Sequence, residues 1–231
     1  MKKLTATHLL LFLLVTLITP VHASVTMQAT IDQNIHVVFI FENINSTIYT
    51  ETKQTFNIST IPNTIVKNLE QQDLTRVKWS YDLEQQIFDD STHSIRVEFY
   101  LAGSDIINFT FNRVTMARIY RIQTEWRKFH INLSHNFSLD FAQYFNTPVA
   151  DWNYSESEKT YSYETAEPDS INSTCKFVLP STATNVRAVE NTIIFEVPPL
   201  LEDILLNSPF LILGALVIVI LVAFLYRRIR K

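Results

Sequence analysis

Glycine and cysteine are almost absent from this chain, whose 231 residues include two glycines and one cysteine. So few glycines exclude a glycine-rich phosphate-binding loop and a collagen-like repeat. A single cysteine excludes an internal disulfide framework. The composition, 47% hydrophobic and 18% charged, is that of a chain that folds or enters a membrane, so general disorder is excluded as well.

Acidic residues are missing from both ends of the chain. All 23 lie between Asp32 and Asp203, whereas six of the 19 basic residues lie outside that span. The 13 basic residues within it leave the middle with a net charge of −10, which the overall value of −4 conceals. Such an acidic region argues against a nucleic-acid partner.

The first apolar run has the features of a secretory signal peptide. Lys2 and Lys3 precede it, and the helix-breaking Pro20 and the small Ala23 follow it. An apolar run of about ten residues is too short to span a bilayer, so an uncleaved anchor is the weaker reading. We expect residues 1–23 to be removed, which would leave Ser24 as the N-terminus.

A second apolar run, over residues 210–226, contains no charge, and four basic residues follow it within residues 227–231. This pattern predicts a transmembrane helix in contact with lipid, followed by a short cytoplasmic tail. Basic residues stay in the cytoplasm, so the N-terminus is expected outside and the C-terminus inside. Residues 200–209 form a juxtamembrane segment.

Residues 24–199 are expected to form one extracytoplasmic domain, because no linker or repeat divides them. Alternating apolar and polar residues predict a mostly β fold, an antiparallel β-sandwich with one or two short helices. One expected helix begins near Pro62, and the other covers 138–145. Residues 94–112 are expected to form a β-hairpin around Gly103. The other expected strands are 25–31, 35–41, 54–58, 75–81, 114–124, 127–133, 175–179 and 191–197. The sixteen asparagines are expected to occupy the turn positions with positive φ that glycine usually fills.

Seven Asn-x-Ser/Thr sequons lie in the expected extracytoplasmic domain. Their asparagines are Asn45, Asn57, Asn108, Asn132, Asn136, Asn153 and Asn172. In five of them the middle residue is apolar, so a strand would turn that residue inward and the asparagine outward, where a glycan can be attached. The sequence therefore predicts a glycoprotein.

The residues that usually carry catalysis form no recognisable motif. Cys175 is expected to be a buried core residue, and a covalent dimer or a thiol nucleophile is the alternative. His130 and His135 lie five residues apart, and no acidic residue completes a metal site around them. We therefore predict no catalytic residue, metal or cofactor, and no enzymatic activity.

Aromatic residues are interleaved with charge in two stretches, one basic from Arg113 to Lys128 and one acidic from Asp140 to Ile171. The polar Ser, Thr and Glu residues of the acidic stretch predict a loop there. Exposed aromatic side chains of this kind would bind a protein or a carbohydrate partner. The predicted interaction surface consists of Arg118, Tyr120, Arg121, Trp126, Trp152, Tyr154, Tyr161 and Tyr163. The alternative is that the two stretches pack against each other or stay solvated.

The end of the chain resembles the C-terminal sorting signals of archaeal surface proteins, in which a short motif, a helix and a basic tail direct cleavage and lipid attachment. Ser208, Pro209 and Phe210 would be the motif, although it lacks a glycine between Pro209 and Phe210. The leading hypothesis is an anchored cell-surface protein that acts in binding or in the structure of the cell envelope. The alternatives are an anchored hydrolase and an accessory subunit of a larger membrane complex.

Overall fold

The computed structural model describes residues 23–82, 85–135, 137–165, 171–207 and 209–229. Most of the expected signal peptide, the sequon asparagine Asn136 and the last two residues of the expected tail lie outside the described residues.

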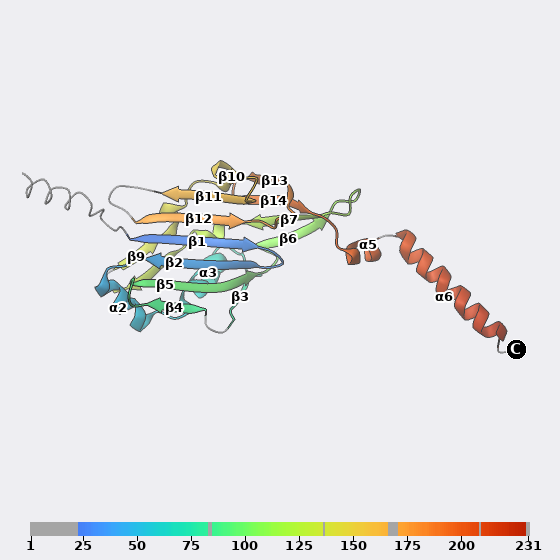
Figure 1. The fold of residues 1–231 in the computed structure, drawn as a ribbon, viewed down its shortest axis with the longest axis horizontal. Coiled ribbons are helices and arrows are strands. Elements are labelled where there is room, and N and C mark those ends of the chain that lie inside the picture. Colours follow the sequence, from blue (N-terminus) through green and yellow to red (C-terminus); the bar gives the residue numbers. More distant parts are fainter. Residues whose placement is uncertain (1–22, 83–84, 136, 166–170, 208, 230–231) are drawn as a thin grey trace, which may run out of the picture.

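An eight-stranded sheet is the largest part of the fold (Figure 1). Its strand order is β10-β11-β12-β1-β2-β5-β3, and β4 also pairs with β5. Its neighbouring strands are antiparallel except for β1 and β12, which are parallel. The strands are β1 (Ser24–Ile31), β2 (Ile35–Glu42), β3 (Lys78–Ser80), β4 (Gln86–Asp89), β5 (Ser94–Ala102), β10 (Asn153–Ser155), β11 (Thr160–Thr165) and β12 (Asn172–Val178).

A smaller antiparallel sheet and a two-stranded hairpin accompany it. The smaller sheet has the order β13-β14-β7-β6, and the hairpin is formed by β8 and β9. These strands are β6 (Ile107–Phe111), β7 (Arg118–Gln123), β8 (His130–Ser134), β9 (Phe137–Asp140), β13 (Thr184–Val189) and β14 (Thr192–Val197). The helices are α2 (Ser46–Thr55), α3 (Thr60–Glu70), α4 (Phe141–Tyr144), α5 (Leu201–Asn207) and α6 (Pro209–Ile229), with 3₁₀ turns η1 (Glu125–Arg127) and η2 (Val149–Asp151).

The core lies on one face of the large sheet, because its strands alternate between buried and partly exposed residues. Every second residue of β1 and of β5 is buried. Phe39 of β2 lies at the centre of this face, where its ring stacks beside Phe41 and Phe99 and contacts Phe129 and Phe141 from the opposing layer. Residues of the smaller sheet and of α3 belong to the same buried cluster. One hydrophobic core therefore joins the layers.

The expected mostly β fold with antiparallel sheets is confirmed, but the expected hairpin over 94–112 is wrong. β5 pairs with β2, whereas β6 pairs with β7 in the other sheet. The carbonyl oxygen of Gly103 accepts hydrogen bonds from the backbone of Ile106 and Ile107, at 3.2 and 2.9 Å. This turn directs the chain from one sheet to the other, with Ile106 buried at the crossing.

Three further expectations differ from the structure. The segment 54–58 is the end of α2 and the loop after it, not a strand. The α2 helix lacks an apolar stripe that would have predicted it, since Tyr49 and Thr52 are its buried residues. The segment 138–145 is strand β9 in its first part and becomes helical only at α4. In the acidic stretch, which suggested a loop, the chain forms β10 and β11.

Turn positions with positive φ are filled mostly by residues other than asparagine. Among the described non-glycine residues, seven have positive φ, and two of these are Asn43 and Asn185. The others are Asp73, His93, Met116, Lys159 and Glu190. The expectation that asparagine substitutes for glycine is therefore correct at two turns and wrong at five.

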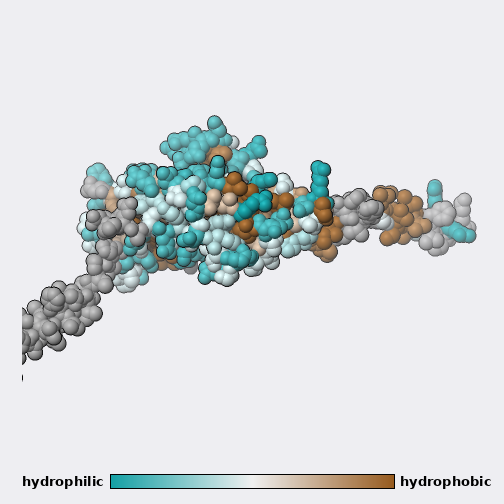
Figure 2. Space-filling view, turned by 90° about the horizontal axis from the view of Figure 1, so that it is seen from above, coloured by the Kyte–Doolittle hydropathy of each residue, from teal (hydrophilic) through white to brown (hydrophobic). Residues whose placement is uncertain are grey.

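The C-terminal helix α6 extends from the domain, with α5 between them (Figure 1). Its eight described aliphatic side chains longer than alanine, from Leu213 to Val222, are all exposed. In Figure 2 they form the brown segment at the end of the molecule. Within the described residues, no helix reaches the combination of length and apolarity that a membrane crossing requires.

Candidate functional site

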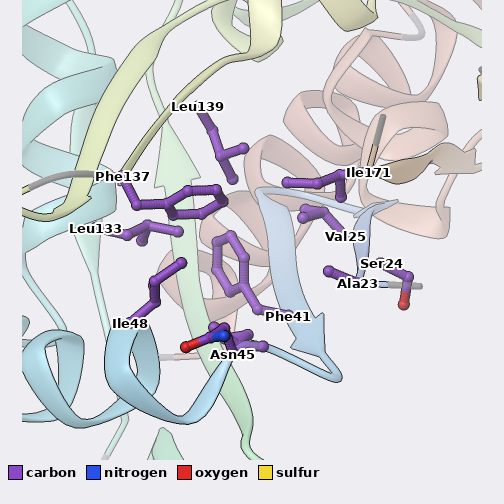
Figure 3. Close-up of a pocket in the computed structure, with 11 residues that line it drawn as sticks. Ala23, Ser24, Val25, Phe41, Asn45, Ile48, Leu133, Phe137, Leu139 and Ile171 are labelled. Atoms are coloured by element: carbon purple, nitrogen blue, oxygen red, sulfur yellow. The ribbon is translucent and has the colours of Figure 1, made fainter. Parts of the chain in front are cut away.

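A small apolar pocket lies where β1 begins and β2 ends (Figure 3). Its volume is about 120 Å³, and its lining is almost entirely apolar. The lining residues are Ala23, Ser24, Val25, Phe41, Ile44, Asn45, Ile48, Leu133, Phe137, Leu139 and Ile171. It lies at the end of the large sheet opposite to α5 and α6 (Figure 1).

The chemistry of this pocket is limited to contact with an apolar group. Its polar residues are Ser24 and Asn45. The Ser24 hydroxyl donates to a carboxylate oxygen of Glu42 at 3.2 Å, and the Asn45 side-chain oxygen accepts from the backbone N–H of Thr47 at 2.9 Å. Because no carboxylate lines this pocket, it is not the paired-carboxylate cleft that a typical glycoside hydrolase uses.

The structure buries half of the predicted interaction surface. Trp126 is fully buried, and Tyr120, Trp152 and Tyr161 are less than 9% exposed. They are core residues because their rings pack against other aromatic rings: Tyr120 stacks on Phe195, and Tyr161 lies against Tyr154. Trp126 and Trp152 both pack against Phe177, with ring centroids 5.8 and 5.6 Å apart. The alternative, in which the basic and acidic stretches pack on each other, is correct for Arg127 and Trp152, which are in contact.

Arg127 joins the two stretches. Its guanidinium donates to the carbonyl oxygen of Thr147, to the side-chain oxygen of Asn191 and to Thr124, at 2.8 to 3.0 Å. It also lies over the ring of Trp152, 5.2 Å from the centroid. The side chain is fully buried, and desolvation lowers the pKa of the guanidinium. Arg127 therefore acts as an internal cross-link between η1, η2 and the turn before β14.

The other four predicted residues keep some exposed surface but lie in different places. Arg121 on β7 is exposed, and Arg118 is largely covered by its partner Asp203. Tyr154 and Tyr163 are half-buried on β10 and β11. Burial, followed by a hydrogen bond to Glu156, raises the pKa of Tyr154. The structure thus does not bring the eight residues together into one exposed surface.

The outer face of the large sheet is a surface that the sequence reasoning missed. In Figure 1 no described helix or strand lies in front of β1, β2 and β5. Glu98 is central to it, because it accepts from Arg96 at 2.5 Å and contacts the His36 ring nitrogen at 3.2 Å. The His36 ring stacks on Tyr100, with centroids 4.7 Å apart. The polar residues that alternate with the apolar ones in β1 and β5 were the available signal, whereas β2 places Val38 and Ile40 on this face.

The six described sequon asparagines are all exposed. They are Asn45, Asn57, Asn108, Asn132, Asn153 and Asn172. The predicted inward turn of the middle residue is correct for Leu133, which is 2% exposed, and wrong for Phe109, which is 44% exposed on β6. β6 is an edge strand of the smaller sheet, so part of its surface has no covering layer.

The remaining reactive groups are dispersed. Cys175 is fully buried among core residues, as expected, and burial raises the pKa of its thiol. His130 and His135 are both exposed, and His130 contacts the Asn132 side-chain oxygen at 3.1 Å. Among the residues that the structure describes, no three His, Cys, Asp or Glu side chains are grouped so that they could hold a metal ion.

Comparison with known proteins places the chain in no family: no family model, no curated protein and no solved structure matches it.

Proposed function

We propose that this chain is a cell-surface protein, held in the membrane by α6, whose extracytoplasmic β domain acts in binding or in the structure of the cell envelope. The signal peptide that the sequence predicts would export the domain, and β1 begins at Ser24, directly after the expected cleavage site. The orientation predicted by the basic residues places the domain outside the cell.

The exposed apolar side chains of α6 carry this proposal. Leu216 to Val222 are consecutive, so at about 100° per residue they cover all sides of the helix, which in water would leave a large unpaired apolar surface. The uncharged run has seventeen residues, fewer than the roughly 20 of a typical membrane span. The anchor that we propose therefore fits a thin hydrocarbon core, with Tyr226 and Arg227 reaching the head groups.

A binding or structural role is favoured over catalysis by the kinds of surface that the domain offers. The uncovered face of the large sheet is broad and carries charged, hydroxyl and aromatic groups. The described pocket holds no acid or base that could move a proton. A binding surface needs a complementary shape and polar groups, but it does not need a catalytic acid or base.

The proposed anchor can be tested by introducing a charged residue in the middle of α6. We expect wild-type protein to stay in the membrane pellet after alkaline extraction. The substitution Val219→Arg should shift the protein toward the soluble fraction, because a central arginine costs about 3 kcal/mol, roughly a hundredfold in partitioning. Val189→Arg is the matched control, since Val189 is exposed on β13, and this variant should stay in the pellet.

Two results would contradict the anchor. One is extraction of the wild-type protein by alkali, and the other is equal retention of wild type and Val219→Arg. The intact mass of the membrane-bound protein separates the anchor from the sorting alternative. A mature chain that has lost residues 210–231 would support cleavage and lipid attachment.

Glycosylation of the exposed sequons gives a second expectation. In a host that modifies asparagine, enzymatic or chemical deglycosylation should lower the mass of the protein. Asn153→Gln and Asn172→Gln should each remove one glycan, because both asparagines are exposed. Asn34→Gln, at an exposed asparagine without a sequon, is the control and should not change the mass by a glycan. An unshifted wild-type band would reject the glycoprotein prediction.

A further inference from the structure

An ion pair attaches α5 to the smaller sheet. Arg118 of β7 donates two hydrogen bonds to Asp203 of α5, from Nε to Oδ2 and from Nη2 to Oδ1, both at 2.7 Å. Both side chains are largely buried, and the bond from Arg118 lowers the pKa of Asp203. The guanidinium also lies over the ring of Phe109, 5.0 Å from the centroid. This bidentate geometry fixes the orientation of α5 on the domain.

The turn between β6 and β7 lies at the same end of the sheet as α5. Arg118, the first residue of β7, pairs with Phe111 on one side and with Val197 on the other. The turn of residues 112–117 therefore projects beyond the strand end from which the chain continues into α5 (Figure 1). At its tip Val114 is 91% exposed, and Arg113 beside it is exposed as well.

α5 presents apolar side chains to solvent. Leu201 is 72% exposed and Ile204 is 39% exposed. Three residues apart on a helix, they lie within about 60° of each other, whereas Asp203 and Glu202 point in other directions. A single residue, Ser208, separates α5 from α6. A bilayer crossed by α6 must then begin within a few ångströms of the end of α5.

The positions of the sequons agree with this placement. None of the seven sequon asparagines of the sequence lies in residues 112–117 or 200–207. Asn108 is the nearest of them to the turn along β6, and it lies on the opposite face of that strand from Phe109. Glycans on the six exposed asparagines would leave this end of the domain uncovered.

We propose that the β6–β7 turn and α5 form a lipid-contact surface, in which Val114, Leu201 and Ile204 enter the outer head-group region of the bilayer and Arg113 meets lipid phosphates. Apolar side chains flanked by a basic residue bind such interfaces. The proposal rests on the anchor proposed for α6. Arg118 and Asp203 are positioning residues, because they hold α5 and the turn against the same surface.

The test uses the full chain in phosphatidylcholine vesicles, with an environment-sensitive fluorophore attached at one cysteine at a time. The variants are Val114→Cys and Leu201→Cys on the proposed surface, Leu221→Cys in α6, and Gln54→Cys on exposed α2 at the far end of the domain. The buried Cys175 should not be labelled, which wild-type protein checks. Nitroxide-labelled lipids should reduce emission about twofold or more at positions 114, 201 and 221, and leave position 54 unchanged.

The outcomes separate this proposal from the anchor. Quenching at 221 with none at 114 and 201 would overturn the lipid-contact surface and leave the anchor standing. Absence of quenching at 221 would overturn both. In a second set, Asp203→Asn should reduce quenching at 114 without changing it at 221, and unchanged quenching at 114 would reject the positioning role. Unfolding curves of Asp203→Asn confirm that the domain remains folded during the measurement.

Discussion

Gly103→Ala is expected to destabilise the domain by more than about 3 kcal/mol, a large share of the roughly 5–15 kcal/mol that an ordinary domain has. Gly103 has a φ of 140°, where side chains are rarely tolerated. A Cβ atom there would lie 1.7 Å from the carbonyl oxygen of Arg76 and 2.9 Å from the Cα of Val77. Both neighbours are backbone atoms, so the turn itself would have to move. Urea unfolding followed by tryptophan fluorescence measures the loss.

The second glycine of the chain provides the control. A Cβ at Gly214 in α6 would meet no atom within 4 Å, so Gly214→Ala should leave the unfolding curve of the domain unchanged. Equal stability of the two variants would show that the turn at Gly103 can relax, and that it does not determine the passage from the large sheet to the small one.

Phe39→Ala is expected to cost about 3–5 kcal/mol, the range measured for large aromatic residues in protein cores. Phe39 is fully buried at the centre of β2. Its ring contacts four other phenylalanine rings, two on the same sheet and two in the opposing layer, so neighbours on both sides would face the cavity. A lower midpoint in urea or heat unfolding measures the loss.

Phe109→Ala is the matched control for this substitution. Phe109 is 44% exposed on the edge strand β6, and its removal should cost about 1 kcal/mol or less. A similar loss at both positions would contradict the assignment of Phe39 to the centre of the core. A small loss at Phe39 would mean that the layers close over the cavity.

The alternation of apolar and polar residues predicted the positions of the strands well, but it did not predict which strands pair. β1, β2, β5 and β14 lie where the period of two predicted them, because each has one face in the core. α2 was missed because its buried residues do not form an apolar stripe. β10 and β11 were missed because their polar residues resembled a loop. The parallel pairing of β1 with β12 joins residues about 150 positions apart, which no local pattern encodes.

The candidate site residues were likewise predicted correctly where local polarity decides their exposure, and wrongly where contacts with distant segments decide it. Exposure of the described sequon asparagines agrees with the sequence reasoning, since polar residues on strands and caps face water. The predicted aromatic surface was wrong for Trp126 and Trp152, because an aromatic residue near charges can lie on either face of a strand. Neither the ion pair between Arg118 and Asp203 nor the buried Arg127 could be inferred, since their partners lie far away in sequence.

The sequence by itself determined the β-rich class of the domain, the faces of its regular strands and the burial of Cys175, because all of these follow from side-chain polarity read at a fixed local spacing. The scarcity of glycine excluded phosphate-binding loops, but the tertiary structure decided where glycine was needed: at Gly103, against the backbone of Arg76 and Val77. It also decided which strands pair and which aromatic residues are buried. Those outcomes depend on contacts between distant segments, and such contacts exist only once the two sheets share one core.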